Sequence, residues 1–478
     1  MRRPSQLAVI LATTAVCCGM SIAQVNFSQT AINSGDTATS GIANGDFDKD
    51  GILDLVTVNA GTLSFYKGLG GGKYGNPVSQ NLAQYRGQVV AADFNRDGRL
   101  DLAIATACCT GSGGVTMLLG NGDGTFRQGT NISLSGNNAV SLALADLNGD
   151  HLPDLAVSVY TGHTQVFVGK GDGTFRLTAT LTDGGNQVVA GDFDADGHQD
   201  LAMVAGSNVV LYRGNGNGTF KPPVMASLSN VSFLAVGDFY NNRIQSLAAL
   251  VTFFLGGGNF ENDLYTLRYS GGQLLVENKN VIAAVTGDPY QQLVGGDLNG
   301  DFKDDLFLVG GNFQGSAVSA YMLGNGNGTF QGAVAAPHWM DLQYYPFIRD
   351  LNLDSRHDVG IAWTSIFDNI GGEETLLNTS AKTNCTPPKA SAMSVHVCAP
   401  SNGQVVGKTF TFRGAGNAWN GVAKRMELWI DGKKVGQNLE DQLKVTTTLS
   451  KGTHKASFVV VGSFDDHVSG SVSFTSSY

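Results

Sequence analysis

The sequence predicts an all-β fold, a seven-bladed β-propeller followed by a small β-sandwich. Two motifs that repeat in phase predict the propeller, and short alternating strands near the C-terminus predict the sandwich. The composition agrees, because 64 of the 478 residues are Gly and 42% are hydrophobic, as expected for short strands joined by tight turns. A chain of this length is also too long to fold around one ordinary hydrophobic core. We therefore expect two folded domains.

The first motif is an acidic loop of nine residues. A run of small apolar residues leads into Asp-[Phe/Leu]-[Asp/Asn]-x-Asp, and three residues later another Asp begins an apolar strand. The motif starts at Asp46, Asp93, Asp146, Asp192, Asp297 and Asp350, and a degenerate copy starts at Asp238. Successive copies begin about 46 to 59 residues apart, the size of a four-stranded propeller blade.

The second motif is a Gly-rich turn that ends in an aromatic residue, about 25 to 30 residues after most acidic loops. It spans 120–126, 169–175, 214–220 and 324–330, with looser versions at 68–74 and 256–260. Gly-rich punctuation after an apolar strand is typical of a hairpin whose aromatic residue begins the next strand. Two motifs in phase therefore predict repeated four-stranded units.

The two ends of the repeat region complement each other. The last copy stops after Leu376-Leu377-Asn378-Thr379, without a final aromatic strand. Asn26-Phe27-Ser28-Gln29 near the N-terminus resembles Thr125-Phe126-Arg127-Gln128, which has that role in another copy. We expect the N-terminal segment to supply the outermost strand of the last blade, which would close the ring and protect the open edges.

The acidic loop has the pattern of a calcium site. Carboxylates at positions 1, 3 and 5 converge, position 7 offers a backbone carbonyl and position 9 adds a carboxylate; oxygen ligands in a flexible turn suit Ca²⁺ better than Zn²⁺ or copper. A helical EF-hand needs Glu at position 12, which is apolar or Thr here, so the loop is expected to enter a strand. Asp and Asn also cap turns without metal. Six copies with Asp at positions 5 and 9 favour calcium, about five or six ions per chain.

The degenerate copy at Asp238 is predicted to bind no calcium. Positions 3, 5 and 9 are Tyr240, Asn242 and Ser246, so the loop has too few carboxylates.

These motifs resemble the FG-GAP/VCBS repeats, best known from the head domains of integrin α subunits. The resemblance covers residues 24–380 and implies a propeller with calcium in the loop between the first two strands of each blade. The ligands that it implies are Asp46, Asp48, Asp50, Ile52 and Asp54; Asp93, Asn95, Asp97, Arg99 and Asp101; Asp146, Asn148, Asp150, Leu152 and Asp154; Asp192, Asp194, Asp196, His198 and Asp200; Asp297, Asn299, Asp301, Lys303 and Asp305; and Asp350, Asn352, Asp354, Arg356 and Asp358, with the seventh residue of each loop acting through its carbonyl. The literal Phe-Gly and Gly-Ala-Pro sequences are absent, so integrin-type partners are not implied. His151 replaces the Gly at position 6 of the third loop, a departure that bears on the shape of that turn.

Residues 381–394 are predicted to form a linker and residues 395–478 a separate domain. Alternating segments such as Thr409–Phe412 and Met426–Ile430 resemble the small bacterial immunoglobulin-like modules of secreted proteins. Cys385 and Cys398 flank a Pro-containing segment and are predicted to form a disulfide. Cys108 and Cys109 are adjacent, and they form either a vicinal disulfide or two free thiols.

Residues 1–23 are predicted to be a secretory signal peptide. Arg2 and Arg3 precede an apolar stretch that ends in small residues at a plausible cleavage site. We therefore expect a secreted, extracellular or cell-surface protein, with the periplasm as the alternative, and no membrane span. The net charge of −10 argues against a nucleic-acid ligand. The chain is expected to be a monomer.

The function expected from the sequence is non-catalytic binding or adhesion to a glycan or an extracellular protein. Exposed aromatic and basic residues on loops opposite the acidic loops form the candidate ligand surface: Tyr85, Arg86, Tyr160, His163, Tyr290, Trp339, Tyr344, Tyr345 and Trp363. The alternatives are a polysaccharide lyase or sugar oxidoreductase on the same scaffold, and a structural matrix protein. The sequence contains no G-x-S-x-G, H-E-x-x-H or Cys/His pair, so no enzyme is predicted.

Overall fold

The computed structural model describes residues 25–477 apart from 34–40, 60, 83–86, 107–112, 135–137, 207, 257–258, 283–289, 312–316, 337–341, 353–355, 365–370, 380–393, 418–422, 439–441 and 463–466. The predicted signal peptide and nearly all of the predicted linker lie outside these residues. Every regular element that the structure describes is a β-strand. The described part of the chain contains no helix with the length and hydropathy of a membrane-spanning segment.

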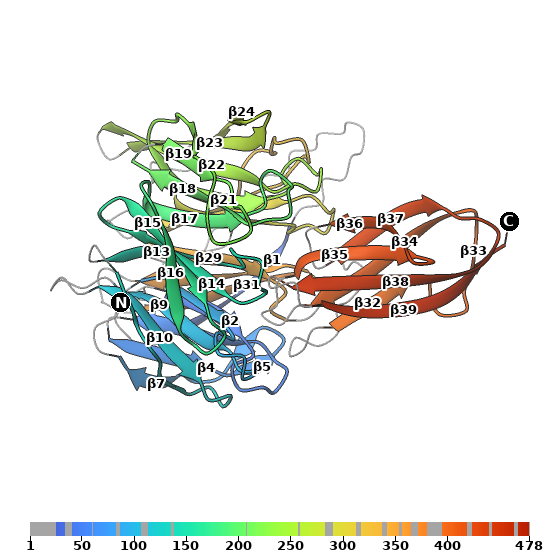
Figure 1. The fold of residues 1–478 in the computed structure, drawn as a ribbon, viewed down its shortest axis with the longest axis horizontal. Coiled ribbons are helices and arrows are strands. Elements are labelled where there is room, and N and C mark those ends of the chain that lie inside the picture. The colour runs from blue at the N-terminus through green and yellow to red at the C-terminus, as the bar shows by residue number, and fades with distance from the viewer. Residues whose placement is uncertain are drawn as a thin grey trace, which may run out of the picture.

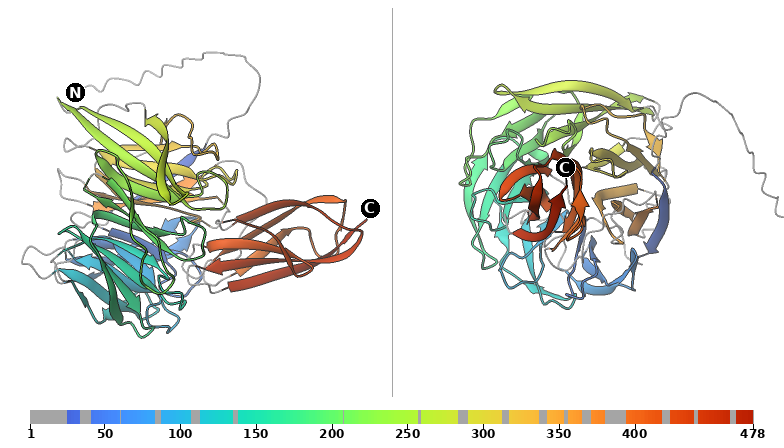
Figure 2. Two further views of the ribbon diagram at one scale, coloured as in Figure 1. Left: turned by 45° about the horizontal axis from the view of Figure 1, so that its top comes forward. Right: turned by 90° about the vertical axis from the view of Figure 1, so that its right-hand side faces the viewer.

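The larger part of the described chain is a ring of antiparallel sheets around a central axis (Figure 1 and the right-hand view of Figure 2). The described strands form seven such sheets, named here sheets 1 to 7 and given from the inner strand outward. Sheet 1 has β2 (Gly41–Gly45), β3 (Asp54–Asn59), β4 (Thr62–Tyr66) and β7 (Val78–Asn81), with the small hairpin of β5 (Gly68–Gly70) and β6 (Lys73–Tyr74) beside it; sheet 2 has β8 (Val89–Ala92), β9 (Asp101–Thr106), β10 (Gly114–Gly120), and β11 (Phe126–Gln128) and β12 (Ile132–Ser133), which both pair with β10; sheet 3 has β13 (Ala139–Ala145), β14 (Asp154–Val159), β15 (His163–Gly169) and β16 (Phe175–Leu181). Sheet 4 has β17 (Gly185–Gly191), β18 (Asp200–Ala205), β19 (Asn208–Tyr212) and β20 (Val224–Ala226); sheet 5 has β21 (Val231–Gly237), β22 (Ser246–Gly256), β23 (Asn259–Ser270) and β24 (Gln273–Ile282); sheet 6 has β25 (Tyr290–Gly296), β26 (Asp305–Gly311), β27 (Ala317–Met322) and β28 (Val334–Ala335); and sheet 7 has β29 (Leu342–Arg349), β30 (Asp358–Thr364), β31 (Gly371–Asn378) and β1 (Phe27–Asn33). The all-β propeller fold predicted from the sequence is confirmed.

The second strand of each sheet is its most buried element. Strands β3, β9 and β14 are buried at every residue, and they read as short runs of small and β-branched residues after the initial Asp. A strand that is covered on both faces has no solvent side, so its sequence loses the alternation of polar and apolar residues. The core therefore lies between neighbouring sheets rather than in one place. Separate apolar clusters join each sheet to the next.

The ring closes through the N-terminal segment. Strand β1 pairs antiparallel with β31, from Phe27 opposite Asn378 to Asn33 opposite Gly372, and it is the outermost strand of sheet 7. The inner strands also contact one another in order, and β2 of sheet 1 contacts β29 of sheet 7. The prediction that the N-terminal segment supplies the missing outer strand is confirmed.

A second unit, the C-terminal module, follows the ring. One sheet contains β32 (Ser394–Ala399), β34 (Thr409–Asn417) and β37 (Gln442–Thr448); the other contains β33 (Val405–Val406), β39 (His467–Ser476), β38 (Gly452–Gly462), β35 (Ala423–Ile430) and β36 (Lys433–Asn438). Phe412 of the first sheet packs edge-on against Phe474 of the second, with ring centroids 5.4 Å apart, inside one shared core. The module is therefore a β-sandwich. Its immunoglobulin-like character stays a prediction.

One buried carboxylate in this module is expected to contribute measurably to stability. Arg425 Nε, Lys434 Nζ and Trp429 Nε1 donate to the Glu427 carboxylate at 2.8, 2.6 and 2.9 Å. Burial opposes ionisation, but these donors outweigh it and lower the pKa of Glu427 to about 2. We expect Glu427→Gln to destabilise the module by about 2 kcal/mol, because the charge-assisted bonds are lost while the donors stay partly buried.

The same pKa shift determines how the stability of the module depends on pH. A carboxyl whose pKa is lower in the folded state stabilises the fold above its unfolded pKa of about 4.5, and that contribution is lost as the pH falls toward about 2. Amide hydrogen exchange of β35 in the full chain measures this loss of stability. Protection should fall with acidification in the wild type and less in the Gln variant. Equal acid sensitivity of the two proteins would contradict the assignment.

Candidate metal centres

The acidic loops occupy equivalent positions in the ring. Each connects the inner strand of a sheet to its second strand, as the loop Asp46–Asp54 connects β2 to β3. Equivalent strands run in the same direction in every sheet, so these loops emerge on one side of the ring, here called the acidic-loop face. Sheet 5 carries the degenerate copy at Asp238, and the other six sheets carry the complete motif.

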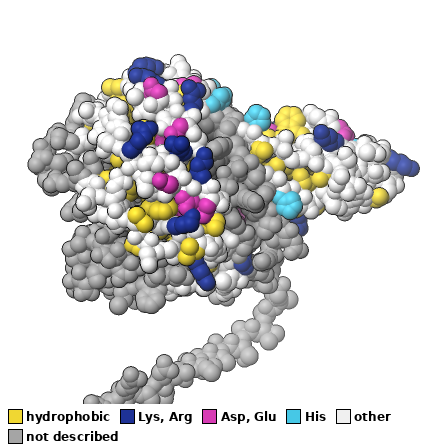
Figure 3. Space-filling model, turned by 90° about the horizontal axis from the view of Figure 1, so that it is seen from below, with side chains coloured by type: hydrophobic (Ala, Val, Ile, Leu, Met, Phe, Trp, Pro, Cys, Tyr) yellow, Lys and Arg dark blue, Asp and Glu magenta, His cyan; other side chains and the backbone are white. Residues whose placement is uncertain are grey.

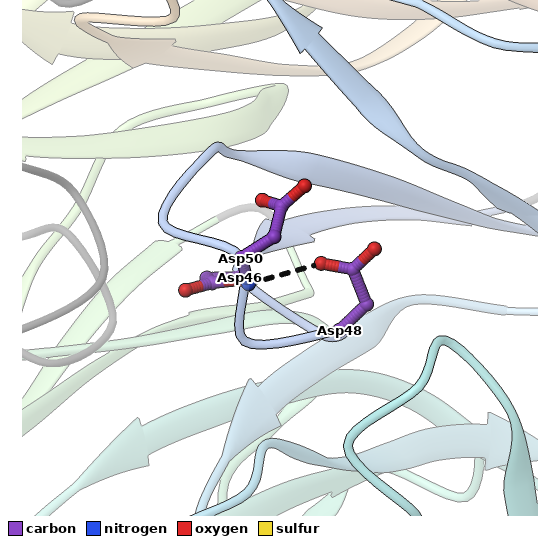
Figure 4. Close-up of side chains that lie close together, drawn as sticks. All are labelled: Asp46, Asp48 and Asp50. Carbon is purple, nitrogen blue, oxygen red and sulfur yellow. Dashed lines mark hydrogen bonds between the residues drawn. The ribbon is translucent and has the colours of Figure 1, made fainter.

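In the first loop, three carboxylates surround a tight turn (Figure 4). Asp46 accepts hydrogen bonds from the amides of Asp50 and Gly51 at 3.0 and 3.1 Å, and Asp48 Oδ1 accepts from the amide of Asp50 at 3.2 Å. Oxygens of Asp46, Asp48 and Asp50 all lie within 4.8 Å of one another. The turn therefore brings three anionic oxygens to one point, as the sequence predicts for positions 1, 3 and 5.

The ninth residue of each complete loop is an Asp with no exposed surface. In sheet 3, Asp154 Oδ2 accepts from the amide of Leu147 at 2.9 Å, and its Oδ1 accepts from the amide of Gly169 at 2.8 Å. The same pair of bonds recurs at Asp54, Asp101, Asp200, Asp305 and Asp358. The position 9 carboxylate thus holds the loop to the end of the third strand, a structural role that the sequence motif alone does not show.

Burial makes these carboxylates costly to ionise. Desolvation raises the pKa of four position 9 carboxyls to about 7: Asp54, Asp101, Asp154 and Asp200. Desolvation also raises the pKa of Asp46 at position 1, and the negative charges of Asp50 and Asp48 raise it further. A divalent cation at the centre of the loop would remove this repulsion and favour the charged form of every carboxylate around it.

The loop of sheet 4 gives the most direct test of whether a cation fits. Oxygens of Asp192, Asp194 and Asp200 lie within 4.8 Å of one another, so positions 1, 3 and 9 converge. Asp192 Oδ2 accepts from the amide of Gly197 at 3.1 Å, whereas Asp192 Oδ1 is buried and has no hydrogen-bond partner among the described residues. A buried carboxylate oxygen without a donor is unfavourable unless a cation coordinates it. An all-oxygen set of this kind fits Ca²⁺.

Lysine side chains approach two of the loops, a feature absent from the motif. Lys67 Nζ contacts Asp48 and lies 2.5 Å from Asp50 Oδ2. Lys221 Nζ lies 2.9 Å from Asp196 Oδ2 and 3.6 Å from Asp194 Oδ2. The lysines follow the third strand or the Gly-rich turn of the same sheet, far from the loop in sequence. Their charges offset the carboxylates at positions 3 and 5 and would compete with a cation there.

The degenerate loop keeps the backbone shape without the charge. The amides of Asn242 and Arg243 donate to Asp238 at 2.9 and 2.7 Å, as in the complete loops. Ser246 replaces the position 9 Asp and accepts from the amide of Phe239 at 3.3 Å. The turn therefore forms with a single carboxylate among positions 1, 3, 5 and 9, because backbone amides donate to the side chains of Asp238 and Ser246. The number of carboxylates distinguishes a candidate metal loop from a capped turn. That this loop binds no calcium stays a prediction.

Position 6 of the loop requires a left-handed backbone. His151 has φ of 65°, close to the 77° of Gly98 and the 87° of Gly197 at the same position. The departure from Gly therefore leaves the turn intact, at the steric cost of a Cβ at positive φ.

Replacing His151 is expected to relieve that cost. We expect His151→Gly to stabilise the chain by about 0.5 kcal/mol, since relief of backbone strain exceeds the added entropy of the unfolded Gly. The ring of His151 lies 3.5 Å from Asp146 and is exposed, so its loss costs little. Chemical denaturation shows whether the free energy of unfolding rises or falls in the Gly variant. A destabilised Gly variant would show that the His side chain contributes more than its backbone costs.

Four described Gly-rich turns, in sheets 2, 3, 4 and 6, each join their sheet to the acidic loop of the preceding one. The amide of Gly173 donates to the carbonyl of Phe94 at 3.0 Å, and the rings of Phe94 and Phe175 pack edge-on with centroids 5.6 Å apart. Equivalent hydrogen bonds connect Gly124 to Phe47, Gly218 to Leu147 and Gly328 to Phe239. The two sequence motifs are therefore in contact across sheet boundaries, and anything that orders an acidic loop also supports the next sheet.

The predicted ligand surface is only partly described. Tyr160 is 76% exposed, and the half-buried His163 forms side-chain hydrogen bonds with Thr161 and Gln165. Tyr290 is a correction: it is only 2% exposed, because the alternation of β25 turns it into the core between sheets 5 and 6. The side chains of the remaining candidates lie outside the described residues: Tyr85, Arg86, Trp339, Tyr344, Tyr345 and Trp363.

Several other predicted site residues also lie outside the described residues. Asp354 of the last loop, Cys385, Cys108 and Cys109 belong to this group. Cys398 is disulfide-bonded. Its pairing with Cys385 stays a prediction.

Known proteins resemble this chain in the sequence of its repeats and in its fold. The family model described as FG-GAP-like repeat matches residues 46–104, 93–157 and 192–245. These stretches contain four of the complete acidic loops and all but the last residue of the degenerate one. The chain therefore carries FG-GAP-like repeats. No curated protein matches the chain.

The solved structures similar to this chain include a lectin. BP39L lectin from Burkholderia pseudomallei is 11% identical, and the match covers 74% of this chain and 99% of the lectin with a TM-score of 0.51. BBS1N in complex with ARL6DN is 10% identical, with 73% of this chain and 95% of that one covered and a TM-score of 0.48. The fibronectin(III)-like modules of Clostridium thermocellum CbhA are 20% identical, with 17% and 96% covered and a TM-score of 0.17. At such identities the likeness to the lectin concerns the fold alone.

Proposed function

We propose that the chain is a secreted, calcium-stabilised β-propeller that binds a glycan or an extracellular protein without catalysis. The observation that carries the calcium part is the group of Asp192, Asp194 and Asp200 around a buried oxygen of Asp192 that has no donor. Residues at the same positions of the other complete loops would hold further ions, and each ion would supply positive charge where the buried carboxylates repel one another.

Binding is the function that this fold best supports here. A solved structure with a similar fold is a lectin, so carbohydrate is the first ligand class to test. Figure 3 shows Lys and Arg side chains intermixed with Asp and Glu on one face of the ring, without a field of one sign. A mixed surface of this kind favours short-range contacts over long-range attraction of a polyanion.

The test combines metal content with ligand screening. Mass spectrometry of the folded chain should give about five or six calcium ions, and a glycan array in calcium should then identify the ligand class. A chain with no bound calcium would refute the metal assignment. A metal-loaded chain that recognises no glycan and no extracellular protein would refute the binding function, and the matrix-protein alternative would then be favoured.

A further inference from the structure

A cavity of about 630 Å³ lies inside the ring of sheets, and all seven inner strands contribute to its lining. Its volume is typical of a site for a small ligand. The lining includes Asn186 and Gln187 of β17, Phe233 of β21 and Phe347 of β29.

The described residues of the lining carry no formal charge. Its polar side chains are amides and one hydroxyl, such as those of Gln88, Asn186 and Ser141, and the rest is apolar, including Val189 and Phe233. The cavity differs in this respect from the acidic-loop face of the same ring. A charged ligand would lose its hydration here without meeting a counter-charge, whereas a neutral ligand with many hydroxyls would meet donors, acceptors and apolar contact area.

Repeated β-bulges affect which side chains line the cavity. The inner strands β13, β17 and β25 each have an irregular register near their start, which leaves Val140, Asn186 and Gln291 outside the regular pairing. All three residues line the cavity. Bulges of this kind redirect a side chain, and they are frequent beside binding sites.

Neighbouring groups hold the lining amides in place. Gln88 Oε1 accepts from Ser141 Oγ at 3.1 Å and from the amide of Leu142 at 2.8 Å. Gln187 Nε2 donates to the carbonyl of Leu234 at 3.1 Å, and the amide of Leu234 donates back to Gln187 Oε1 at 2.6 Å. These bonds connect one sheet to the next and fix the side chains before any ligand arrives, which lowers the entropy cost of binding.

The C-terminal module and the β-bulges lie at opposite ends of the inner strands. Lys444 of the C-terminal module lies 5.8 Å from the ring centre of Phe302, which belongs to an acidic loop. The right-hand view of Figure 2 places this module in front of the centre of the ring. The bulges lie at the opposite ends of the inner strands.

We propose that this cavity is the ligand site and that it receives the end of a neutral oligosaccharide, about one to three sugar residues. This inference rests on the proposed function as a glycan-binding module. The side-chain amides bind the hydroxyls, and Phe233 and the valines cover the apolar faces of the sugar rings.

The test uses the full chain in calcium and calorimetric titration with cellotetraose, chitotetraose and tetragalacturonate. At least one neutral tetrasaccharide should bind, and the anionic one should not. Asn186→Ala should weaken binding of the neutral sugar about tenfold through loss of a hydrogen bond, and Val189→Trp should abolish it by filling the cavity. Asn81→Ala, on the exposed outer strand of sheet 1, is the matched control and should bind within about twofold of the wild type. Melting curves establish that each variant is folded.

Three results would overturn the proposal. If a neutral sugar binds but Asn186→Ala and folded Val189→Trp bind it as the wild type does, the site lies elsewhere and the glycan-binding function stands. If the uronate binds more tightly than the neutral sugars, the uncharged cavity is not the site. If no saccharide binds a calcium-loaded chain, the saccharide assignment fails, while the metal assignment is judged separately by metal content.

Discussion

Chelation of calcium is expected to lower the melting temperature of the chain without residues 1–23 by at least about 10 °C. A site held at about 100 times its dissociation constant stabilises the folded state by about 2.7 kcal/mol, so even two such sites exceed about 5 kcal/mol. The complete loops are suited to this effect, because the carboxyls of Asp54, Asp101, Asp154 and Asp200 are buried with pKa values of about 7. Removal of the cation restores the repulsion among the carboxylates within each loop.

Differential scanning calorimetry with excess Ca²⁺ and with EDTA measures this effect. Mg²⁺ is the control: it prefers small octahedral sites and keeps its waters, so it should restore little of the lost stability. The loss should spread beyond the loops, because the loops that begin at Asp46, Asp93 and Asp146 contact the Gly-rich turn of the next sheet, as Phe94 contacts Gly173. Identical melting curves with calcium and with EDTA would mean that the acidic loops are capped turns only.

Asp154→Ala is expected to destabilise the chain by about 3 to 5 kcal/mol. The carboxylate is fully buried and accepts from the amides of Leu147 and Gly169. Its removal leaves both donors buried without a partner and opens a cavity beside them. The loop and the third strand of sheet 3 would lose their connection.

Asp172→Ala is the matched control, because this Asp accepts hydrogen bonds from Thr174 in an exposed turn of the same sheet. Its melting temperature should stay close to that of the wild type. Measuring both variants with calcium and with EDTA separates two roles of Asp154. A loss that is larger in calcium indicates a metal ligand, whereas an equal loss in both indicates a purely structural carboxylate. A wild-type melting temperature for Asp154→Ala would contradict both roles.

Much of the fold could be predicted because each repeat encodes its own local structure. The apolar run, the acidic turn and the Gly-rich turn specify a strand, a tight loop and a hairpin from residues that are neighbours in the chain. The N-terminal strand could be paired with sheet 7 because it resembles the strand missing from the last copy. Residues that meet only through long-range packing were harder to predict. Tyr290 looked like a surface aromatic and is buried, since nothing in its local sequence shows which face of β25 the next sheet covers.

The sequence by itself determined the repeated β-units, the order of their strands, the acidic loops and the closing role of the N-terminal strand, all of which depend on local pattern or on similarity between copies. Only the tertiary structure decided which groups the ring brings together. It placed Lys67 beside Asp48, joined four Gly-rich turns to the preceding acidic loops, and assembled a cavity whose described lining is uncharged from residues as distant as Ile42 and Phe347. The physical reason is that closure of the ring sets these contacts, and the closure depends on packing between sheets rather than on the propensities of single strands.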